Sequence, residues 1–388
     1  MAIPKDDDDE ETDAFIPMGF MLKCMEISGV LFTKEKRSTR RARFLSAYYA
    51  ISVIVGFIPL TLNLVFNIDD FFNQAMESLH FILAGAHATS KHFNMMFKQD
   101  EFMELFDEIR ALWKEAESKP YLRKYARKKS KRSSKVVKLL YSTLPLTFVV
   151  CSVTMTIFKN TLLGKKDLPI QVWIPLDLDR HGMILCSILQ YYVITTGFMA
   201  YLTNIFLMLT IFDHITLIMR LFIKELSMNR IWTRQERINV YITHSRIIKV
   251  IIKLRDLLAA QWLLETLLSA AQITLRGYMC LKTAKEHDVM FLYSFIVLIV
   301  IIWAISLTYV EGSEITILGE SIHDAVYGLP WYNEDIQDRK ELVFMLTATS
   351  KPLDLNYRSF VLFDRAQFLN IVRASFSYLT MLQVLDSS

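Results

Sequence analysis

Seven stretches of mostly apolar residues follow one another along the chain, with polar loops between them. Each is close to or above the roughly 20 residues with which a helix crosses ~30 Å of hydrocarbon. The stretches are residues 44–66, 75–97, 139–158, 183–207, 262–281, 289–310 and 360–385. The pattern predicts an all-α membrane protein with seven transmembrane helices.

Basic residues are unevenly distributed over the loops between these stretches. The loop before the first stretch and those after the second, fourth and sixth hold 33 of the 44 Lys and Arg residues, with Lys138 counted at the inner end of the third stretch. The alternate loops hold 7, with Arg276 counted at the outer end of the fifth stretch. Because basic loops stay in the cytoplasm, we predict a cytoplasmic amino terminus and, after seven crossings, an external carboxyl terminus. A G-protein-coupled receptor has the opposite orientation, so charge disfavours that class.

These features divide the chain into four regions. Residues 1–43 are predicted to form a cytoplasmic amino-terminal segment, and residues 44–310 to hold the first six transmembrane helices. Residues 311–359 carry apolar clusters that are too short to span a membrane and too apolar to stay solvated. We therefore expect an intracellular helical anchor domain there, packed on itself or on other copies, which implies an oligomer. Residues 360–388 are expected to form the seventh helix and an external tail.

Two cytoplasmic stretches also have apolar residues at helical spacing. In residues 101–115 these residues fall on one face of a helix: Phe102, Leu105, Phe106, Ile109, Leu112 and Trp113. Residues 233–258 show a similar pattern, in which apolar residues are interspersed with charged ones: Ile238, Tyr241, Ile248, Ile252 and Leu254. We expect both stretches to be helices that extend the membrane spans into the cytoplasm.

The second apolar stretch carries more polar groups than the others, namely His80, His87, Lys91 and His92. Such groups are costly when they face lipid, so this helix is predicted to pack inside the bundle or to line a wet cavity. A metal site would need further ligands at the same level. Buried, hydrogen-bonded imidazoles are therefore the favoured interpretation.

Composition and motifs exclude several classes of protein. With 53% hydrophobic residues and a positive mean hydropathy, the chain is too apolar for an ordinary soluble protein. Its basic runs at residues 34–43 and 123–138 flank apolar stretches, where they are expected to contact anionic lipid headgroups rather than nucleic acid. Catalytic, nucleotide-binding and zinc-binding motifs are absent from the sequence, so we predict no enzyme, cofactor or metal. Scarce intramembrane carboxylates and the lack of an inverted repeat disfavour a coupled transporter.

The seventh stretch carries a stripe of small, polar and apolar residues at helical spacing: Asn370, Ala374, Ser377, Met381, Val384 and Leu385. A stripe that is polar below and apolar at its outer end suits a pore wall with a hydrophobic constriction. Small-residue stripes also serve as plain contacts between helices. The residues alone leave both interpretations open.

The carboxyl-terminal third contains a series of residues whose order and spacing are distinctive. The series is Gly312, Glu320-Ser321, Ala325 with Tyr327, Trp331-Tyr332, Lys340, Lys351-Pro352-Leu353, Phe368 and Ser375-Phe376-Ser377-Tyr378-Leu379-Thr380-Met381-Leu382. It resembles the carboxyl-terminal signature of insect odorant receptors. The end of the chain also comes near the closing pattern of gustatory receptors, but its final position is Val384 rather than phenylalanine. A gustatory-type channel is therefore the alternative.

The resemblance implies a tetrameric, odorant-gated, non-selective cation channel in the plasma membrane of sensory neurons. The seventh helix of each subunit would surround one pore, with Met381 at the apolar constriction and Leu385 one turn above it. The family has a shared co-receptor subunit with a much longer second cytoplasmic loop. Because residues 221–261 are short by comparison, this chain resembles a ligand-tuning subunit that assembles with the co-receptor.

A pocket for a small volatile ligand is expected in the outer halves of the second to sixth helices. Apolar walls with a few convergent polar groups suit such a ligand. The candidate residues are His80 and Leu83; Ser152, Met155 and Thr156; Trp173 as a lid; Tyr191, Tyr192, Thr195 and Met199; and Gln272, Leu275, Tyr278 and Met279. Each of them is also compatible with ordinary packing inside a bundle.

Overall fold

The computed structural model describes residues 16–30, 34–162, 168–174, 179–228, 233–285, 290–333, 335–357 and 361–387. Its helices are α2 (Ile16–Ile27), α3 (Lys34–Arg37), α4 (Arg40–Phe66), α5 (Met76–Phe97), α6 (Gln99–Ser118), α7 (Pro120–Leu162), α8 (Arg180–Leu226), α9 (Arg234–Lys285), α10 (Met290–Tyr327), α11 (Ile336–Thr349) and α12 (Arg365–Ser387). The short elements are η1 (Ile68–Asp70), η2 (Phe71–Ala75), η3 (Trp331–Asn333), β1 (Asn356–Tyr357) and β2 (Val361–Leu362). The two strands pair antiparallel, and the fold is otherwise all-α, as predicted.

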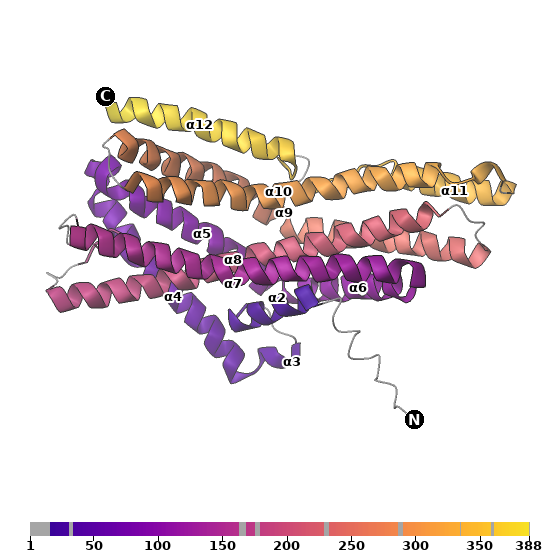
Figure 1. Cartoon of the computed structure of the whole chain (residues 1–388), viewed down its shortest axis with the longest axis horizontal. Coiled ribbons are helices and arrows are strands. Elements are labelled where there is room, and N and C mark those ends of the chain that lie inside the picture. The colour runs from indigo at the N-terminus through magenta and orange to yellow at the C-terminus, as the bar shows by residue number, and fades with distance from the viewer. Residues whose placement is uncertain are drawn as a thin grey trace.

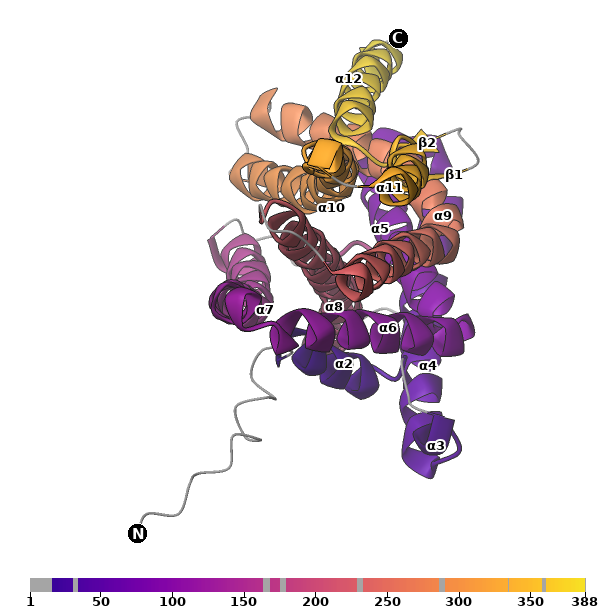
Figure 2. The same ribbon diagram turned by 90° about the vertical axis from the view of Figure 1, so that its right-hand side faces the viewer.

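The long helices run side by side along one axis of the molecule, as Figure 1 shows. Seen down that axis in Figure 2, α8 lies near the middle of the bundle, and α12 projects at its edge. A helix that is apolar all round belongs in a core, and most of the apolar length of α8 is buried. By contrast, only a small share of the apolar lengths of α4, α10 and α12 is buried in the isolated chain.

Each of the seven predicted apolar stretches falls within one helix over nearly all of its length. Residue 75 and residues 361–364 lie outside those helices, and residues 289 and 360 lie outside the described residues. The seventh helix begins at Arg365 rather than at residue 360, because Val361 and Leu362 form β2 and pair with β1. Asp364 then caps the helix: its Oδ1 accepts a hydrogen bond from Gln367 N at 2.7 Å. Within the described part of the chain, four helices are long and apolar enough to cross a membrane: α4, α8, α10 and α12. Seven crossings and their orientation stay predictions.

The two stretches that were predicted to lie in the cytoplasm are helical, as expected. In α6 the six apolar residues of the predicted stripe are all buried against the bundle. The first half of α9 follows its prediction less closely, because Ile238 and Ile252 are exposed whereas Leu254 is buried. The inward face is made instead by neighbours such as Val240 and Ile247. This half of α9 packs against α6 and α8, and its Arg237 forms an ion pair with Asp338 of α11.

The region predicted as an anchor domain is built from the end of α10, from α11 and from the hairpin. Eight of its apolar residues are buried within the chain: Ile315, Leu318, Ile322, Val326, Leu329, Leu342, Met345 and Leu355. Others remain exposed, among them Trp331, Val343 and Phe344, the last with 79% of its surface accessible. The division of the chain into domains and the assembly role of this region stay predictions.

The segment that leads into α12 is held firmly against α9 and α10. Phe363 stacks between Trp262 and Tyr309, with ring centroids 4.5 and 4.2 Å away. Its backbone N donates to Leu355 O at 2.8 Å. At the first residue of α12, Arg365 N donates to Ser313 Oγ at 2.8 Å. The amino-terminal end of α12 is therefore fixed to the bundle.

Candidate functional site

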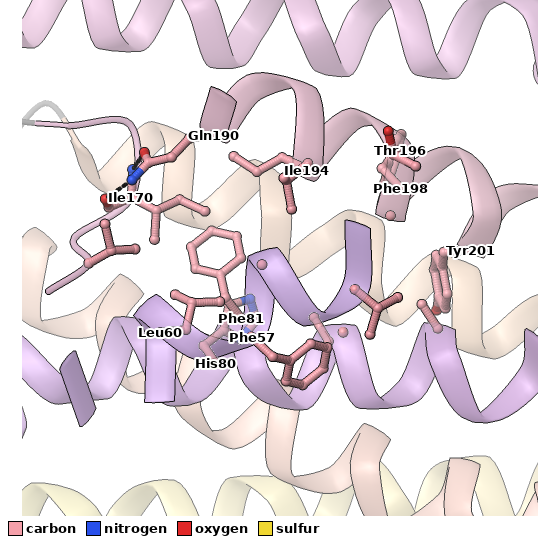
Figure 3. Close-up of a pocket in the computed structure, with 18 of the residues that line it drawn as sticks. Phe57, Leu60, His80, Phe81, Ile170, Gln190, Ile194, Thr196, Phe198 and Tyr201 are labelled. Carbon is pink, nitrogen blue, oxygen red and sulfur yellow. Dashed lines mark hydrogen bonds between the residues drawn. The ribbon is translucent and has the colours of Figure 1, made fainter. Parts of the chain in front are cut away.

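A cavity of ≈ 720 Å³ lies inside the bundle between α4, α5, α7, α8, α9 and α10. Apolar side chains such as Phe57, Phe81 and Ile194 make most of its wall, as Figure 3 shows. This volume falls in the range of small-molecule sites, which are mostly apolar with a few polar groups. The cavity is thus suited to a small, largely apolar molecule.

The segment of residues 168–174 closes one end of the cavity. The backbone of its buried Ile170 makes two hydrogen bonds with the side-chain amide of Gln190 (Figure 3). Ile170 N donates to Gln190 Oε1 at 3.0 Å, and Gln190 Nε2 donates to Ile170 O at 3.1 Å. Ser78 Oγ donates to Gln171 O at 3.1 Å, and the ring of Trp173 lies 4.9 Å from that of Phe66. The segment is therefore tied to α4, α5 and α8 as a lid.

A few polar side chains interrupt the apolar wall. His80 on α5 is buried and its Nδ1 has no hydrogen-bond partner. Arg276 on α9 is 1% exposed, and its Nε also lacks a partner. The guanidinium lies 5.7 Å from the ring centroid of Tyr293 on α10, and its charge acts on the His80 imidazole. These groups give the cavity one polar, positively charged wall.

A ladder of polar contacts continues from the cavity along the interface of α5 and α9. Gln272 Nε2 lies 3.1 Å from His87 Nδ1, and Lys91 Nζ pairs with Glu265 Oε1 at 3.0 Å. The prediction that the second apolar stretch packs inside the bundle is confirmed, because its three histidines and Lys91 are all buried. Among the described residues, no group of His, Cys, Asp or Glu could hold a metal ion.

The opposite side of α9 holds α12. Ser375 Oγ donates to Ala270 O at 3.2 Å, and Thr274 Oγ1 donates to Ser375 O at 3.2 Å. The Cα of Gly277 approaches Leu379 so closely that an added Cβ would lie 2.6 Å from Leu379 Cδ1. One helix therefore contributes both to the cavity wall and to the seat of α12.

The family model described as "7tm Odorant receptor" matches residues 72–376. The chain belongs to the 7tm odorant receptor family. This confirms the resemblance seen in the sequence, and the members of this family are receptors and ligand-gated channels rather than enzymes. No curated protein sequence matches the chain.

Two solved structures share the fold of this odorant receptor. The insect olfactory receptor OR5 from Machilis hrabei superposes with a TM-score of 0.73 at 11% identity, covering 97% of this chain and 99% of that one. The same receptor in complex with eugenol gives 0.74 at 13% identity, covering 98% and 100%. At such low identity the likeness concerns the fold.

The structure places three of the candidate ligand residues in the wall of this receptor's cavity: His80, Trp173 and Gln272. Leu83, Leu275, Tyr278 and Met279 gather in a separate small apolar cluster with Met76. On α8 the cavity is faced by Gln190, Ile194 and their helical neighbours. Tyr191, Tyr192, Thr195 and Met199 lie on α8 beside this face. The side chains of Ser152, Met155 and Thr156 lie outside the described residues.

Two parts of the wall were not expected from the sequence. The inner surface of α4, including Phe57, belongs to a helix that was left out of the predicted pocket. Arg276 was counted with the outer loops, but it lies inside α9 and lines the cavity. Its spacing of four residues from Gln272 and its place in an apolar stretch were the signals that could have found it.

The predicted pore residues of α12 lie away from the helix that α12 packs on. The buried side of α12 is Ile371, Ser375 and Leu379. Asn370, Ser377, Met381, Val384 and Leu385 are exposed, and Ala374 is half-buried. These positions of α12 are therefore accessible in the isolated chain.

Proposed function

We propose that this chain is a ligand-tuning odorant receptor subunit. It binds a small, largely apolar volatile in the cavity and opens a non-selective cation pore walled by α12, in a tetramer with the shared co-receptor. The observation that carries the proposal is the apolar cavity beside α9, the helix that also seats α12. The complex of Machilis hrabei OR5 with eugenol supports a small volatile as the kind of ligand.

Gating follows from the shared use of α9. Gln272 and Arg276 face the cavity, while Thr274 and Gly277, on the same two turns, contact α12. A ligand shifts such an equilibrium only by its differential affinity for the closed and open arrangements. A ligand that fits better when α9 has moved therefore favours the arrangement in which α12 is displaced.

The proposed subunit sits in the plasma membrane with its amino terminus inside and Ser388 outside. The alternation of basic loops supports this orientation. The end of α12 that bears Met381, Val384 and Leu385 then lies at the outer mouth, where an exposed apolar ring can close a pore by dewetting. The opposite end of α12, fixed by the Phe363 segment, lies at the inner side.

We expect odorant-evoked cation current from cells that express this chain with the co-receptor. The current should persist in excised patches without nucleotide or G-protein components, because the ligand acts on the pore directly.

An epitope fused behind Ser388 should bind antibody on intact cells, and one at the amino terminus should bind antibody only after permeabilisation. A fast current that needs a G protein, or an epitope behind Ser388 that stays hidden on intact cells, would contradict the proposal.

Replacing Met381 with alanine is expected to raise the current measured without odorant several-fold. Met381 is 59% exposed on α12, and its truncation should widen an apolar constriction. Phe376 is the matched control, because it is also exposed but lies roughly 140° away around the helix. If Met381→Ala and Phe376→Ala leave the unstimulated current equally unchanged, Met381 does not form the gate.

A further inference from the structure

Arg276 is a buried cation whose charge is not needed to hold an apolar ligand. Arginine remains charged at physiological pH, and a buried charge without a partner is strongly unfavourable. Yet Arg276 is 1% exposed and lines the cavity, and it does not reach the surface of the bundle. The fold therefore keeps an unfavourable charge in the wall of its ligand site.

The cavity offers this charge no counter-charge. Among the described residues that line it, none is Asp or Glu. Glu265, the buried carboxylate of α9, lies eleven residues earlier, which is roughly 16 Å along the helix axis. It is already paired with Lys91 at 3.0 Å. The ring of Tyr293 supplies a cation–π contact only, which does not neutralise the charge.

A second polar atom in the same wall also lacks a partner. His80 Nδ1 on α5 is buried and unpaired, and His80 is within reach of the charge of Arg276. The amide of Gln272, one turn before Arg276, already contacts His87. Arg276 and His80 thus form the polar corner of the cavity, while Phe57 and Phe81 belong to the apolar part of its wall.

We infer that the preferred ligands of this receptor are small carboxylic acids, bound as carboxylates. Their two oxygens meet Arg276, in the bidentate geometry that guanidinium and carboxylate share, with His80 beside them. The hydrocarbon tail lies against the apolar wall. An ester or an alcohol of the same length leaves the charge of Arg276 unneutralised. This inference rests on the proposed function, because it takes the cavity as the ligand site.

The position of Arg276 also connects the head group to gating. Gly277 follows it directly and touches Leu379 of α12. A carboxylate that draws the Arg276 side chain into the cavity therefore acts on the turn of α9 that seats α12. A ligand without the head group fills the cavity but lacks this connection.

The test compares straight-chain acids from butyrate to decanoate with their methyl esters and the matching alcohols, on cells that express the chain with the co-receptor. Acids should reach half-maximal current at the lowest concentrations. Arg276→Met should raise that concentration for acids about tenfold to hundredfold, the loss expected for a charge-assisted hydrogen bond, and should not weaken the response to the esters. Arg276→Lys should keep part of the response to acids. Lys282→Met removes a cation from the same helix outside the cavity and serves as the control.

Thermal unfolding of purified wild-type and Arg276→Met receptor with octanoate or methyl octanoate gives a readout independent of current. Octanoate should raise the Tm of the wild type only. Equal responses of both proteins to acids, or a loss in Lys282→Met as large as in Arg276→Met, would overturn the inference. A receptor that responds to neutral volatiles but not to acids overturns it too, and leaves the proposed function standing. Absence of current with every compound of a broad volatile panel counts against both.

Discussion

Replacing Lys91 with methionine is expected to destabilise the folded receptor by about 3–5 kcal/mol. Lys91 and Glu265 are 2% and 4% exposed and pair at 3.0 Å between α5 and α9. Methionine leaves the Glu265 carboxylate buried without its cation. At this depth the surrounding helices cannot solvate the charge as water would, so the charge is strongly unfavourable. Low surface expression and a large fall in the Tm of the detergent-solubilised protein would show this.

The double replacement Lys91→Met with Glu265→Leu separates the charge from the packing. Exchange of a buried ion pair for apolar residues of similar volume is often neutral, so the second change should restore much of the lost Tm. Lys36→Met is the matched control, because the Lys36–Glu26 pair at 2.7 Å is far more exposed and worth about 0.2–1 kcal/mol. A fall in Tm for Lys91→Met no larger than for Lys36→Met would contradict the expectation.

The helices were predictable because their signals are local. An apolar run of sufficient length predicts a buried or membrane helix wherever it packs. The stripe from Phe102 to Trp113 likewise shows its buried face in the sequence itself. The three histidines and Lys91 of α5 also identified it as an inner helix, since imidazole and ammonium groups are costly against lipid.

The rotation of the helices around their axes was not predictable in the same way. Near the cavity α8 is apolar on every side, so its sequence has no periodic signal for the face that meets the cavity. Gln190 and Ile194 line the cavity, whereas Tyr191 and Thr195, one residue further along, lie beside it. Which helices enclose a cavity also depends on long-range packing. The sequence around Phe57 on α4 therefore gives no sign that this residue lines the cavity.

Replacing Gly312 with alanine is expected to destabilise the receptor by about 1–3 kcal/mol, as overpacking does, and to disturb gating. Alanine in a helix normally adds about 0.5–1 kcal/mol of stability over glycine. At Gly312, however, the new Cβ would meet the backbone carbonyl oxygen of Phe363 and, at 2.9 Å, its Cδ1. The carbonyl cannot retreat, because the Phe363 ring is stacked between Trp262 and Tyr309.

The displacement must therefore pass to the segment that leads into α12, which is the inner end of the proposed pore wall. Gly319→Ala on the same helix is the matched control, because its Cβ meets only the flexible side chain of Leu353, at 3.2 Å. We expect a lower Tm and an altered unstimulated current for Gly312→Ala, and close to wild-type values for Gly319→Ala. Truncating the Phe363 ring should not rescue Gly312→Ala, since the nearest atom is a backbone oxygen. Wild-type stability and current in Gly312→Ala would show that α12 is not fixed at this point. The proposed path from the cavity to the pore would then have to run through the contacts between α12 and α9 alone.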